Sequence, residues 1–277
     1  MSVYVLVHGA WHGGWCWCKV VPLLERAGHT VLAPDLPSLG KDKTPVSEVS
    51  LALWAEHVCR LLDAQPEPAV LVGHSRGGIV ISEAAERRPG KVKTLVYLTA
   101  FLLRNGESLL QVAGQDTTSL VVQNLVVAED RGSCTVRDEA IREAFYGDCS
   151  DEDVALAQLC LAPEPLAPMA TPVAVSEENF GRVPRVYIEC LQDRAIPPAL
   201  QKQMYTATPC RNVLSMDTSH SPFFSAPRAL ADHLLALYPS AISSARILPA
   251  VCHASGSFRR KRRSWLVVIP SARAALA

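Results

Sequence analysis

The sequence lacks the features of a membrane protein and of a nucleotide-binding enzyme. No run of apolar residues approaches the ~18 that a membrane-spanning helix requires. Neither a G-x-G-x-x-G fingerprint nor a phosphate-binding P-loop occurs, so we expect no nucleotide cofactor. A signal-peptide pattern is also missing, because the chain enters a strand pattern at Val3. We therefore expect a cytoplasmic protein without a membrane span.

The nine cysteines do not form a recognisable disulfide framework or metal-binding motif. Their number is odd and their spacings are irregular, and the close pair Cys16 and Cys18 has no second pair to complete a zinc site. His8 and His12 lie four residues apart, but their loop is rich in glycine and offers no third ligand. We expect reduced, mostly buried thiols, as in cytoplasmic proteins, and no metal ion or other cofactor.

Acidic residues are missing from the last part of the chain. Residues 239–277 hold seven of the 27 basic residues and none of the 27 acidic ones, so residues 1–238 carry a net charge of −7. We interpret 239–277 as a basic C-terminal extension that we expect to be poorly ordered. The alternative is that its basic run, residues 258–265, binds an anionic lipid or a nucleic acid. We favour the first interpretation and expect no nucleic-acid partner.

The chain does have enough apolar residues, 49% of 277, to bury the core of one α/β domain with an insertion. Strand patterns alternate with helix patterns, as the βαβ units of a parallel sheet require. We therefore predict a mostly parallel sheet of about six strands with helices on both faces. The expected strands are Val3–Val7, Thr30–Ala33, Ala69–Val72, Lys93–Leu98, Arg185–Cys190 and Asn212–Met216.

The strongest motif is the pentad Gly73-His74-Ser75-Arg76-Gly77, between a strand pattern and a helix pattern. A G-x-S-x-G in that context is typical of a nucleophile elbow, a tight turn that holds the serine hydroxyl above the sheet. An ordinary glycine-rich turn would not need a serine at its apex. We therefore predict that Ser75 is a catalytic nucleophile.

A nucleophilic serine needs a histidine to accept its proton and an acid to orient the histidine. In enzymes built on such an elbow the chain order is serine, acid, histidine. Of the histidines after Ser75, His233 lies in a helix pattern and His253 in the basic extension. His220 follows the strand pattern 212–216, in a loop where function collects in open α/β sheets. We predict that His220 is the base.

The predicted acid is Asp193, which follows the strand pattern 185–190 almost at once. Asp217 is the competitor, but it lies three residues from His220 and is better placed to shape that loop. The alternative for Asp193 is a structural role, as a helix N-cap or in an ion pair with Arg194. Three other candidates lie in the insertion without a preceding strand: Asp148, Asp151 and Asp153.

Acyl transfer also requires hydrogen-bond donors for the developing oxyanion. One donor is expected to be the backbone N–H of Arg76, directly after the nucleophile. The second should come from the loop after the first strand, residues 8–15, where we predict the backbone N–H of Ala10. Trp11 in the same loop offers apolar surface, and we expect it to contact the substrate.

Residues 103–182 form the predicted insertion, which divides the core into residues 1–102 and 183–238. Two helices are expected in it, at Asp138–Tyr146 and at Asp151–Leu161, the second with Ser150 as its N-cap. Its place before the strand that carries the acid suits a cap, or lid, that excludes water from the site. The alternative is a helical decoration without a gating role.

In these motifs the chain resembles small α/β-hydrolases of the plant methylesterase and hydroxynitrile lyase group, which includes bacterial esterases. The matching segments are residues 8–15 (HGAWHGGW), 73–78 (GHSRGG), 191–197 (LQDRAIP) and 219–222 (SHSP). The resemblance covers about residues 3–238. It implies the α/β-hydrolase fold with a helical cap, a triad of Ser75, Asp193 and His220, and oxyanion donors at Ala10 and Arg76.

The chain departs from that group at positions that bear on chemistry. Hydroxynitrile lyases of the group carry a lysine after the catalytic histidine and a threonine after the histidine of the first loop, where this chain has Ser221 and Gly9. Both differences favour ester hydrolysis over lyase chemistry. Arg76 stands where the group often has an apolar residue. Its side chain could favour polar or anionic substrates, or it could form an ion pair with a helix residue such as Glu83.

We therefore predict a serine carboxylesterase that acts on small to medium carboxylic esters through an acyl-enzyme. One alternative is a hydroxynitrile lyase-like C–C lyase. Another is a ligand-binding receptor with a vestigial triad, against which stands the presence of all three triad residues. The expected partner is a small-molecule ester. The oligomeric state stays open, with a dimer as one option.

Overall fold

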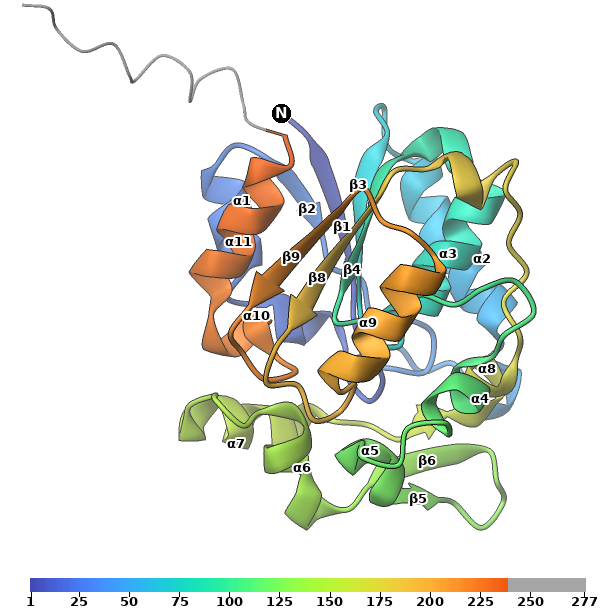
Figure 1. Ribbon diagram of the computed structural model, residues 1–277, viewed down its shortest axis with the longest axis vertical. Helices are drawn as coiled ribbons and strands as arrows, with labels where there is room; N and C mark the ends of the chain where they lie inside the picture. Colours follow the sequence, from blue (N-terminus) through green and yellow to red (C-terminus); the bar gives the residue numbers. More distant parts are fainter. Residues whose placement is uncertain (239–277) are drawn as a thin grey trace, which may run out of the picture. The chain divides into compact units, whose positions relative to one another are not determined.

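Six parallel strands form the central sheet, in the order β2-β1-β3-β4-β8-β9 (Figure 1). The computed structural model describes residues 1–238, so the predicted basic extension, residues 239–277, lies outside the described residues. The strands are β1 (Val3–Val7), β2 (Thr30–Leu32), β3 (Ala69–His74), β4 (Val92–Leu98), β8 (Arg185–Cys190) and β9 (Asn212–Met216). The predicted parallel sheet of about six strands is confirmed.

Helices cover both faces of this sheet, as the doubly wound pattern predicts. In Figure 1, one face packs against α1 (Val21–Arg26) and α11 (Pro227–Ala236). The other face packs against α2 (Leu51–Asp63), α3 (Gly77–Arg87) and α9 (Pro198–Ala207). The short elements of the core are η1 (Gly14–Trp17), η2 (Val46–Glu48), η3 (Pro89–Lys91) and α10 (Pro222–Ser225).

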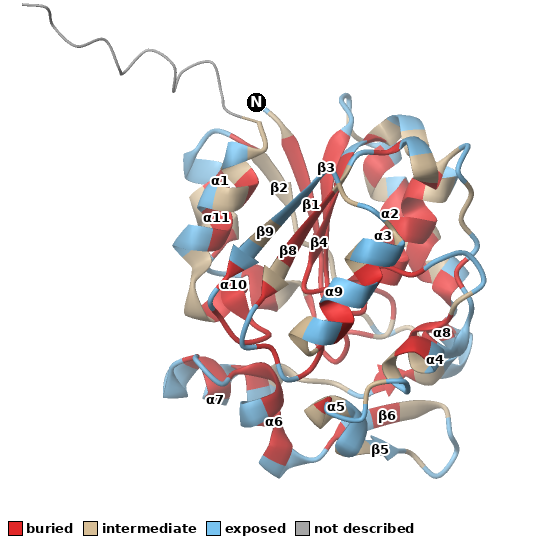
Figure 2. Cartoon of the chain, viewed as in Figure 1, coloured by how far each residue is buried: buried red, intermediate tan, exposed pale blue. Residues whose placement is uncertain are grey.

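The burial of the strands follows from this double cover. Every residue of β1 and β3 is buried, because helices pack on both faces, and the two strands are accordingly near-continuous apolar runs rather than alternating ones. The edge strand β9 is mostly exposed (Figure 2). Within residues 1–238, no helix is both long and apolar enough to cross a membrane.

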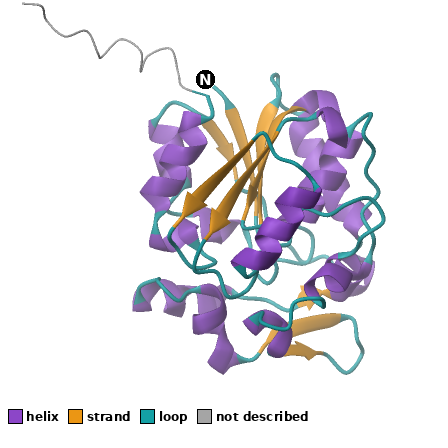
Figure 3. Cartoon of the chain, viewed as in Figure 1, coloured by secondary structure: helices purple, strands orange, loops and turns teal. Residues whose placement is uncertain are grey.

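Most of the segment between β4 and β8, residues 103–170, lies beyond the carboxyl ends of the strands, and the remainder returns along the core to the start of β8 (Figure 3). Its helices are α4 (Leu109–Ala113), α5 (Leu120–Gln123), α6 (Asp138–Phe145), α7 (Asp151–Cys160), α8 (Leu166–Ala170) and the short η4 (Phe180–Arg182). Both predicted helices are present as α6 and α7. The side chain of Ser150 caps α7 as expected, accepting a hydrogen bond from the backbone N–H of Asp153 at 3.2 Å.

The segment is predicted to be helical, but it also contains a three-stranded antiparallel sheet. Its strands, in the order β5-β6-β7, are β5 (Leu125–Val127), β6 (Ser133–Val136) and β7 (Glu164–Pro165). Strands of two to four residues are too short to show a period of two along the sequence. Such pairing is decided by which segments meet in space.

Candidate active site

Ser75 lies at the apex of a sharp turn between β3 and α3. Its φ of 54° is in the left-handed region, which is costly for any residue with a side chain and is a known form of stored strain at functional sites. Gly73 makes the turn possible, because a Cβ there would lie 2.8 Å from the carbonyl oxygen of Gly77. The backbone carbonyl of Ser75 accepts hydrogen bonds from Gly78 at 3.1 Å and Phe101 at 3.0 Å. The strand–turn–helix context predicted for the elbow is therefore present.

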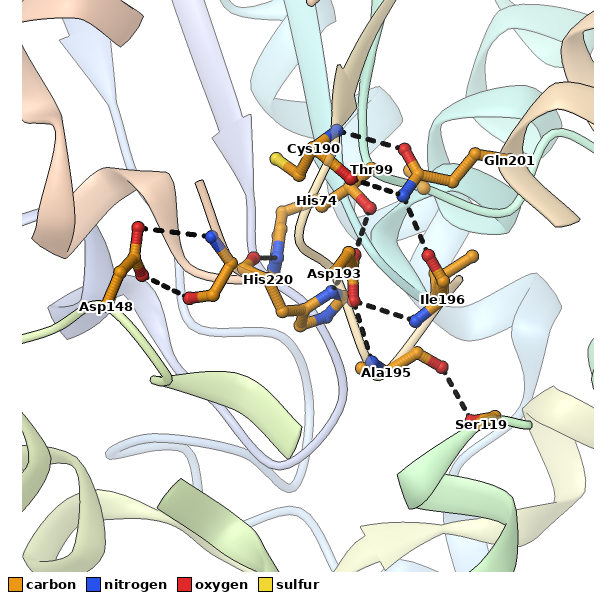
Figure 4. Close-up of polar contacts among 12 residues, drawn as sticks. His74, Thr99, Ser119, Asp148, Cys190, Asp193, Ala195, Ile196, Gln201 and His220 are labelled. Carbon is orange, nitrogen blue, oxygen red and sulfur yellow. Dashed lines mark hydrogen bonds and ion pairs between the residues drawn. The ribbon is translucent and has the colours of Figure 1, made fainter. Parts of the chain in front are cut away.

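Asp193 and His220 meet although 27 residues separate them. Asp193 follows β8 and His220 follows β9, so the neighbouring positions of these strands bring both loops to the same end of the sheet (Figure 4). The Asp193 Oδ2 to His220 Nδ1 distance is 2.6 Å. Both side chains are buried, with exposures of 0% and 1%. The carboxylate can thus hold the proton on Nδ1 and leave Nε2 free to accept one.

The carboxylate of Asp193 is surrounded by donors. Its Oδ1 accepts hydrogen bonds from the backbone N–H groups of Ala195 at 2.7 Å and Ile196 at 2.9 Å. Its Oδ2 accepts a second bond, from the hydroxyl of Thr99, beside that from His220 (Figure 4). Four donors compensate the cost of burying this charge. Sequence reasoning missed Thr99, which lies one residue beyond β4.

The alternatives for the acid have other partners. Asp217 is exposed and accepts a hydrogen bond from Gln192 Nε2 at 2.8 Å, so it shapes the loop as expected. Arg194 forms its ion pair with Glu143 rather than with Asp193. The helix N-cap alternative is wrong, since the N-cap of α9 is Pro197; Asp193 instead accepts two backbone N–H groups of its own loop while also contacting His220.

The side chain of His74, the residue directly before Ser75, forms a hydrogen bond with the backbone of His220. Its Nε2 lies 2.9 Å from the carbonyl oxygen of His220, and the two rings are 4.6 Å apart (Figure 4). Full burial lowers the pKa of His74 well below its ordinary value, so its imidazole is neutral and Nε2 donates this bond. The sequence showed His74 only as a neighbour of the serine.

The loop after β1 passes directly beside the nucleophile. A Cβ at Gly9 would lie 2.7 Å from His74 Nδ1 and 2.9 Å from Ser75 Cβ, so only glycine fits there. Ala10 and Arg76 line the same pocket as Ser75. Across residues 1–238, no protein acceptor takes a hydrogen bond from the backbone N–H of Ala10 or of Arg76. Both groups are therefore available to an oxygen atom of a bound molecule.

The side chain of Arg76 pairs with Glu164, which corrects both expectations for it. Arg76 Nε lies 2.8 Å from Glu164 Oε1, and the two side chains are 1% and 0% exposed. Glu83, the expected partner, pairs instead with Arg87. Burial raises the pKa of Glu164 and lowers that of Arg76, and the charge of each partner opposes the shift. A guanidinium compensated in this way does not favour an anionic substrate.

An apolar pocket opens at Ser75. The residues that line it come from the elbow, the β1 loop, the β8 loop and the inserted segment. They are Ala10, Trp11, Ser75, Arg76, Phe101, Leu109, Leu110, Ala113, Ser119, Val121, Val122, Leu125, Phe145, Met169, Ala195 and Ile196. Trp11, which we expect to contact the substrate, is among the residues that line this pocket.

The inserted segment is bonded to both loops that carry Asp193 and His220. Asp148 accepts hydrogen bonds from the backbone N–H of Ser219, at 3.1 Å, and from its hydroxyl (Figure 4). The hydroxyl of Ser119 donates to the carbonyl oxygen of Ala195 at 2.7 Å (Figure 4). The segment therefore does more than cover the pocket, because its own polar groups hold the loops beneath it.

Comparison with known proteins places the chain in a family and agrees with the fold. Residues 4–233 match the alpha/beta hydrolase family. Putative methylesterase 11, a chloroplastic protein of Arabidopsis thaliana, is 35% identical over 259 residues, covering 89% of this chain and 65% of that relative, so the chain spans slightly less than two thirds of its length. Methylesterase 2 of the same plant is 34% identical over 84% of this chain and 95% of that protein. The solved structure of a pyrethroid hydrolase from Sphingobium faniae is 32% identical, with a TM-score of 0.78 over 86% of this chain and 98% of its own.

Proposed function

The chain belongs to the alpha/beta hydrolase family, in the group of the plant methylesterases, and from that premise we propose that it is a serine carboxylesterase. The observation that carries the proposal is the buried contact of 2.6 Å between Asp193 and His220, whose loops lie at the same end of the sheet as the strained turn of Ser75. A hydrogen-bonded carboxylate and imidazole next to an elbow serine is the arrangement that activates a hydroxyl for attack.

The proposed reaction follows from these positions. Ser75 Oγ attacks the carbonyl carbon of the ester while His220 Nε2 accepts the proton. Asp193 holds the proton on Nδ1, so that the imidazole keeps the tautomer that can act as a base. The backbone N–H groups of Ala10 and Arg76 stabilise the oxyanion of the tetrahedral intermediate. His220 then protonates the leaving alcohol, and water hydrolyses the acyl-enzyme by the same route.

The pocket indicates the class of ester. Thirteen of its sixteen lining residues are apolar, and the one cation among them, Arg76, is compensated by Glu164. We therefore propose neutral esters with an apolar acyl part of small to medium size. Relatives named methylesterases suggest a methyl ester as the first alcohol to test. Trp11 and Phe145 would contact the apolar part of the substrate.

The test is hydrolysis of p-nitrophenyl and methyl esters of increasing acyl length by the purified protein, with Ser75→Ala as the inactive variant. We expect turnover to fall by about 10⁶ in Ser75→Ala, with His220→Ala about equally damaging and the double variant little worse, since triad residues act as a unit. Ser47→Ala, a change at an exposed serine, is the matched control. Ester turnover that survives Ser75→Ala would overturn the assignment.

Each of the two alternative functions predicts a different result for the purified protein. Release of cyanide from a cyanohydrin without ester turnover would indicate a C–C lyase. Tight binding of an ester without either product would indicate a receptor. Our proposal requires both results to be negative.

The cytoplasm remains our proposed location. It is supported by the eight cysteines among the described residues, all of which are free. Fractionation of the source cells with an antibody to the protein tests it, and recovery from an oxidising compartment would contradict it.

A further inference from the structure

Buried side chains hold two consecutive peptide groups of the β1 loop. The carbonyl oxygen of Gly9 accepts from Arg76 Nη2 at 2.9 Å and from His8 Nδ1 at 2.8 Å. The next carbonyl, that of Ala10, accepts from His12 Nδ1 at 2.6 Å. The N–H of the same peptide group, which belongs to Trp11, donates to Glu164 Oε2 at 2.9 Å. All of these donors and acceptors are buried.

The direction of the Gly9–Ala10 peptide group matters, because its N–H is the proposed oxyanion donor of Ala10. In a trans peptide the C=O and N–H bonds point in opposite directions. A guanidinium that holds the oxygen of Gly9 on one side therefore directs the N–H of Ala10 to the other side. Hydrogen bonding at the oxygen also polarises the peptide, which makes its N–H a stronger donor.

The pair of Arg76 and Glu164 contacts both halves of the proposed oxyanion hole. The backbone of Arg76 carries one donor, and its side chain orients the peptide of the other. Glu164 accepts from Arg76 through one oxygen and from the loop through the second. Trp54 covers the guanidinium, whose central carbon lies 4.2 Å from the ring centroid. The carboxylate comes from β7, so the inserted segment completes this arrangement.

A contribution to the stability of the fold does not explain why Arg76 and Glu164 form a buried ion pair. Removing two charges from water is costly, and a buried pair is often no better for stability than apolar residues of the same size. Within residues 1–238, Arg76 Nη1 is buried without a hydrogen-bond partner, which adds to that cost. A role in orienting the peptide groups of the β1 loop explains the presence of this ion pair better.

We infer that Arg76 and Glu164 are positioning residues that aim the backbone N–H of Ala10 at the oxyanion. Arg76 acts through the carbonyl of Gly9, and Glu164 acts through the N–H of Trp11. The inference rests on the proposed esterase function. It concerns the transition state and the tetrahedral intermediate that follows it, because the bound ester does not yet carry this negative charge.

The test separates positioning from stability by removing the charges singly and together. Arg76→Met and Glu164→Gln each leave a buried charge without its partner, so both should lower the melting temperature. Arg76→Met combined with Glu164→Met removes both charges and should recover part of the melting temperature that each single variant loses, the rest being the cost of the unpaired N–H of Trp11. The double variant still lacks the donor to Gly9 and the acceptor for Trp11, so its kcat should stay about tenfold or more below that of the wild type, with KM changed by less than about threefold.

A second measurement reports the oxyanion hole directly. A trifluoromethyl ketone adds to the serine and places an oxyanion in the hole, whereas the corresponding secondary amide binds the pocket without one. The double variant should bind the ketone about tenfold more weakly and the amide unchanged. Arg88→Met, which breaks an exposed ion pair with Asp63, is the control for loss of an arginine and should change neither.

The outcomes are distinguishable from those of the proposed function. If the wild type shows no turnover that depends on Ser75, the esterase proposal fails. If it does, and the stable double variant keeps wild-type kcat and ketone affinity, the positioning inference is wrong. Should the double variant not fold, Arg76→Lys decides. It keeps the charge but lacks the rigid fork that reaches Glu164 and Gly9 together, so kcat should fall about tenfold, and wild-type values would overturn the inference.

Discussion

Among single residues, Asp193 has the most demanding surroundings. Four donors reach its two oxygens: two backbone N–H groups, the hydroxyl of Thr99 and Nδ1 of His220. A neutral side chain could not satisfy all of them. The same carboxylate therefore stabilises its own loop and selects the tautomer of the imidazole.

Replacing Asp193 with asparagine should cost on the order of 10⁴ in kcat. An amide N–H that faces Nδ1 would move the imidazole proton to Nε2, which could then not accept the proton of Ser75. The measurement is kcat on a p-nitrophenyl ester, with the melting temperature recorded alongside. Asp217→Asn, at the exposed competitor, is the matched control and should keep wild-type rates. If Asp217→Asn is the damaging variant, the acid has been assigned to the wrong residue.

Among the elements, the inserted segment and the strand-end loops form one hydrogen-bonded unit. The loop after β9 bonds to Asp148, between α6 and α7, and the loop after β8 bonds to Ser119, the N-cap of α5. Neither loop is part of a helix or strand of the core. The segment thus supplies order that the sheet alone does not supply to these loops.

Asp148→Ala should lower kcat about tenfold, because a loosened Ser219 lets His220 leave its productive position. The loss should appear mainly in kcat and less in KM, since Asp148 does not line the pocket. The control on the same segment is Asp151→Ala, which removes an exposed carboxylate paired with Arg142. Equal losses in the two variants would show that any charge removed from the segment has this effect, contrary to our interpretation.

At the scale of the whole molecule, the interior beneath the site contains three buried neutral histidines. Desolvation lowers the pKa of His12 to about 4 and those of His8 and His74 well below their ordinary values. His12 Nε2 bonds to the hydroxyl of Tyr146, at 2.7 Å, and His8 Nε2 accepts from the N–H of Leu36, at 3.1 Å. Protonation of His8 Nε2 would break its contact, because the N–H of Leu36 can only donate, and protonation of His12 Nε2 would reverse the direction of the bond to Tyr146.

These histidines predict how stability depends on pH. Below an unfolded-state pKa of about 6.5 the unfolded chain binds protons that the folded chain does not, so the free energy of unfolding falls as the solution is acidified. For His12 the loss extends from about pH 6.5 to 4, and a titrating histidine contributes about 1.4 kcal/mol per pH unit. Glu164, whose pKa is raised, opposes this trend, whereas His29 and His57, whose pKa values burial also lowers, add to it.

Urea unfolding at pH 7.5, 6.5 and 5.5 tests this prediction. His12→Asn keeps a donor for the carbonyl of Ala10 and should make the decline shallower by about one histidine's contribution. A free energy of unfolding that stays constant or rises on acidification over this range would contradict the assignment of neutral buried histidines.

The sequence by itself determined which segments form the strands of the parallel sheet. Buried parallel strands are continuous apolar runs, and each is bounded by turn residues, so their signal is local and survives without coordinates. The elbow is a local pattern as well. The candidates Asp193 and His220 could be chosen because both follow predicted strands, and the strand order explains why they lie 2.6 Å apart.

Only the tertiary structure decided the partner of Arg76, the small sheet and the support of the loops. Glu164 is 88 residues from Arg76, and Asp148 is 71 residues from Ser219. No local pattern selects one carboxylate among 27 acidic residues for such a contact. The choice follows from how the inserted segment lies on the core, where burying a charge requires an opposite charge or donors at hydrogen-bonding distance.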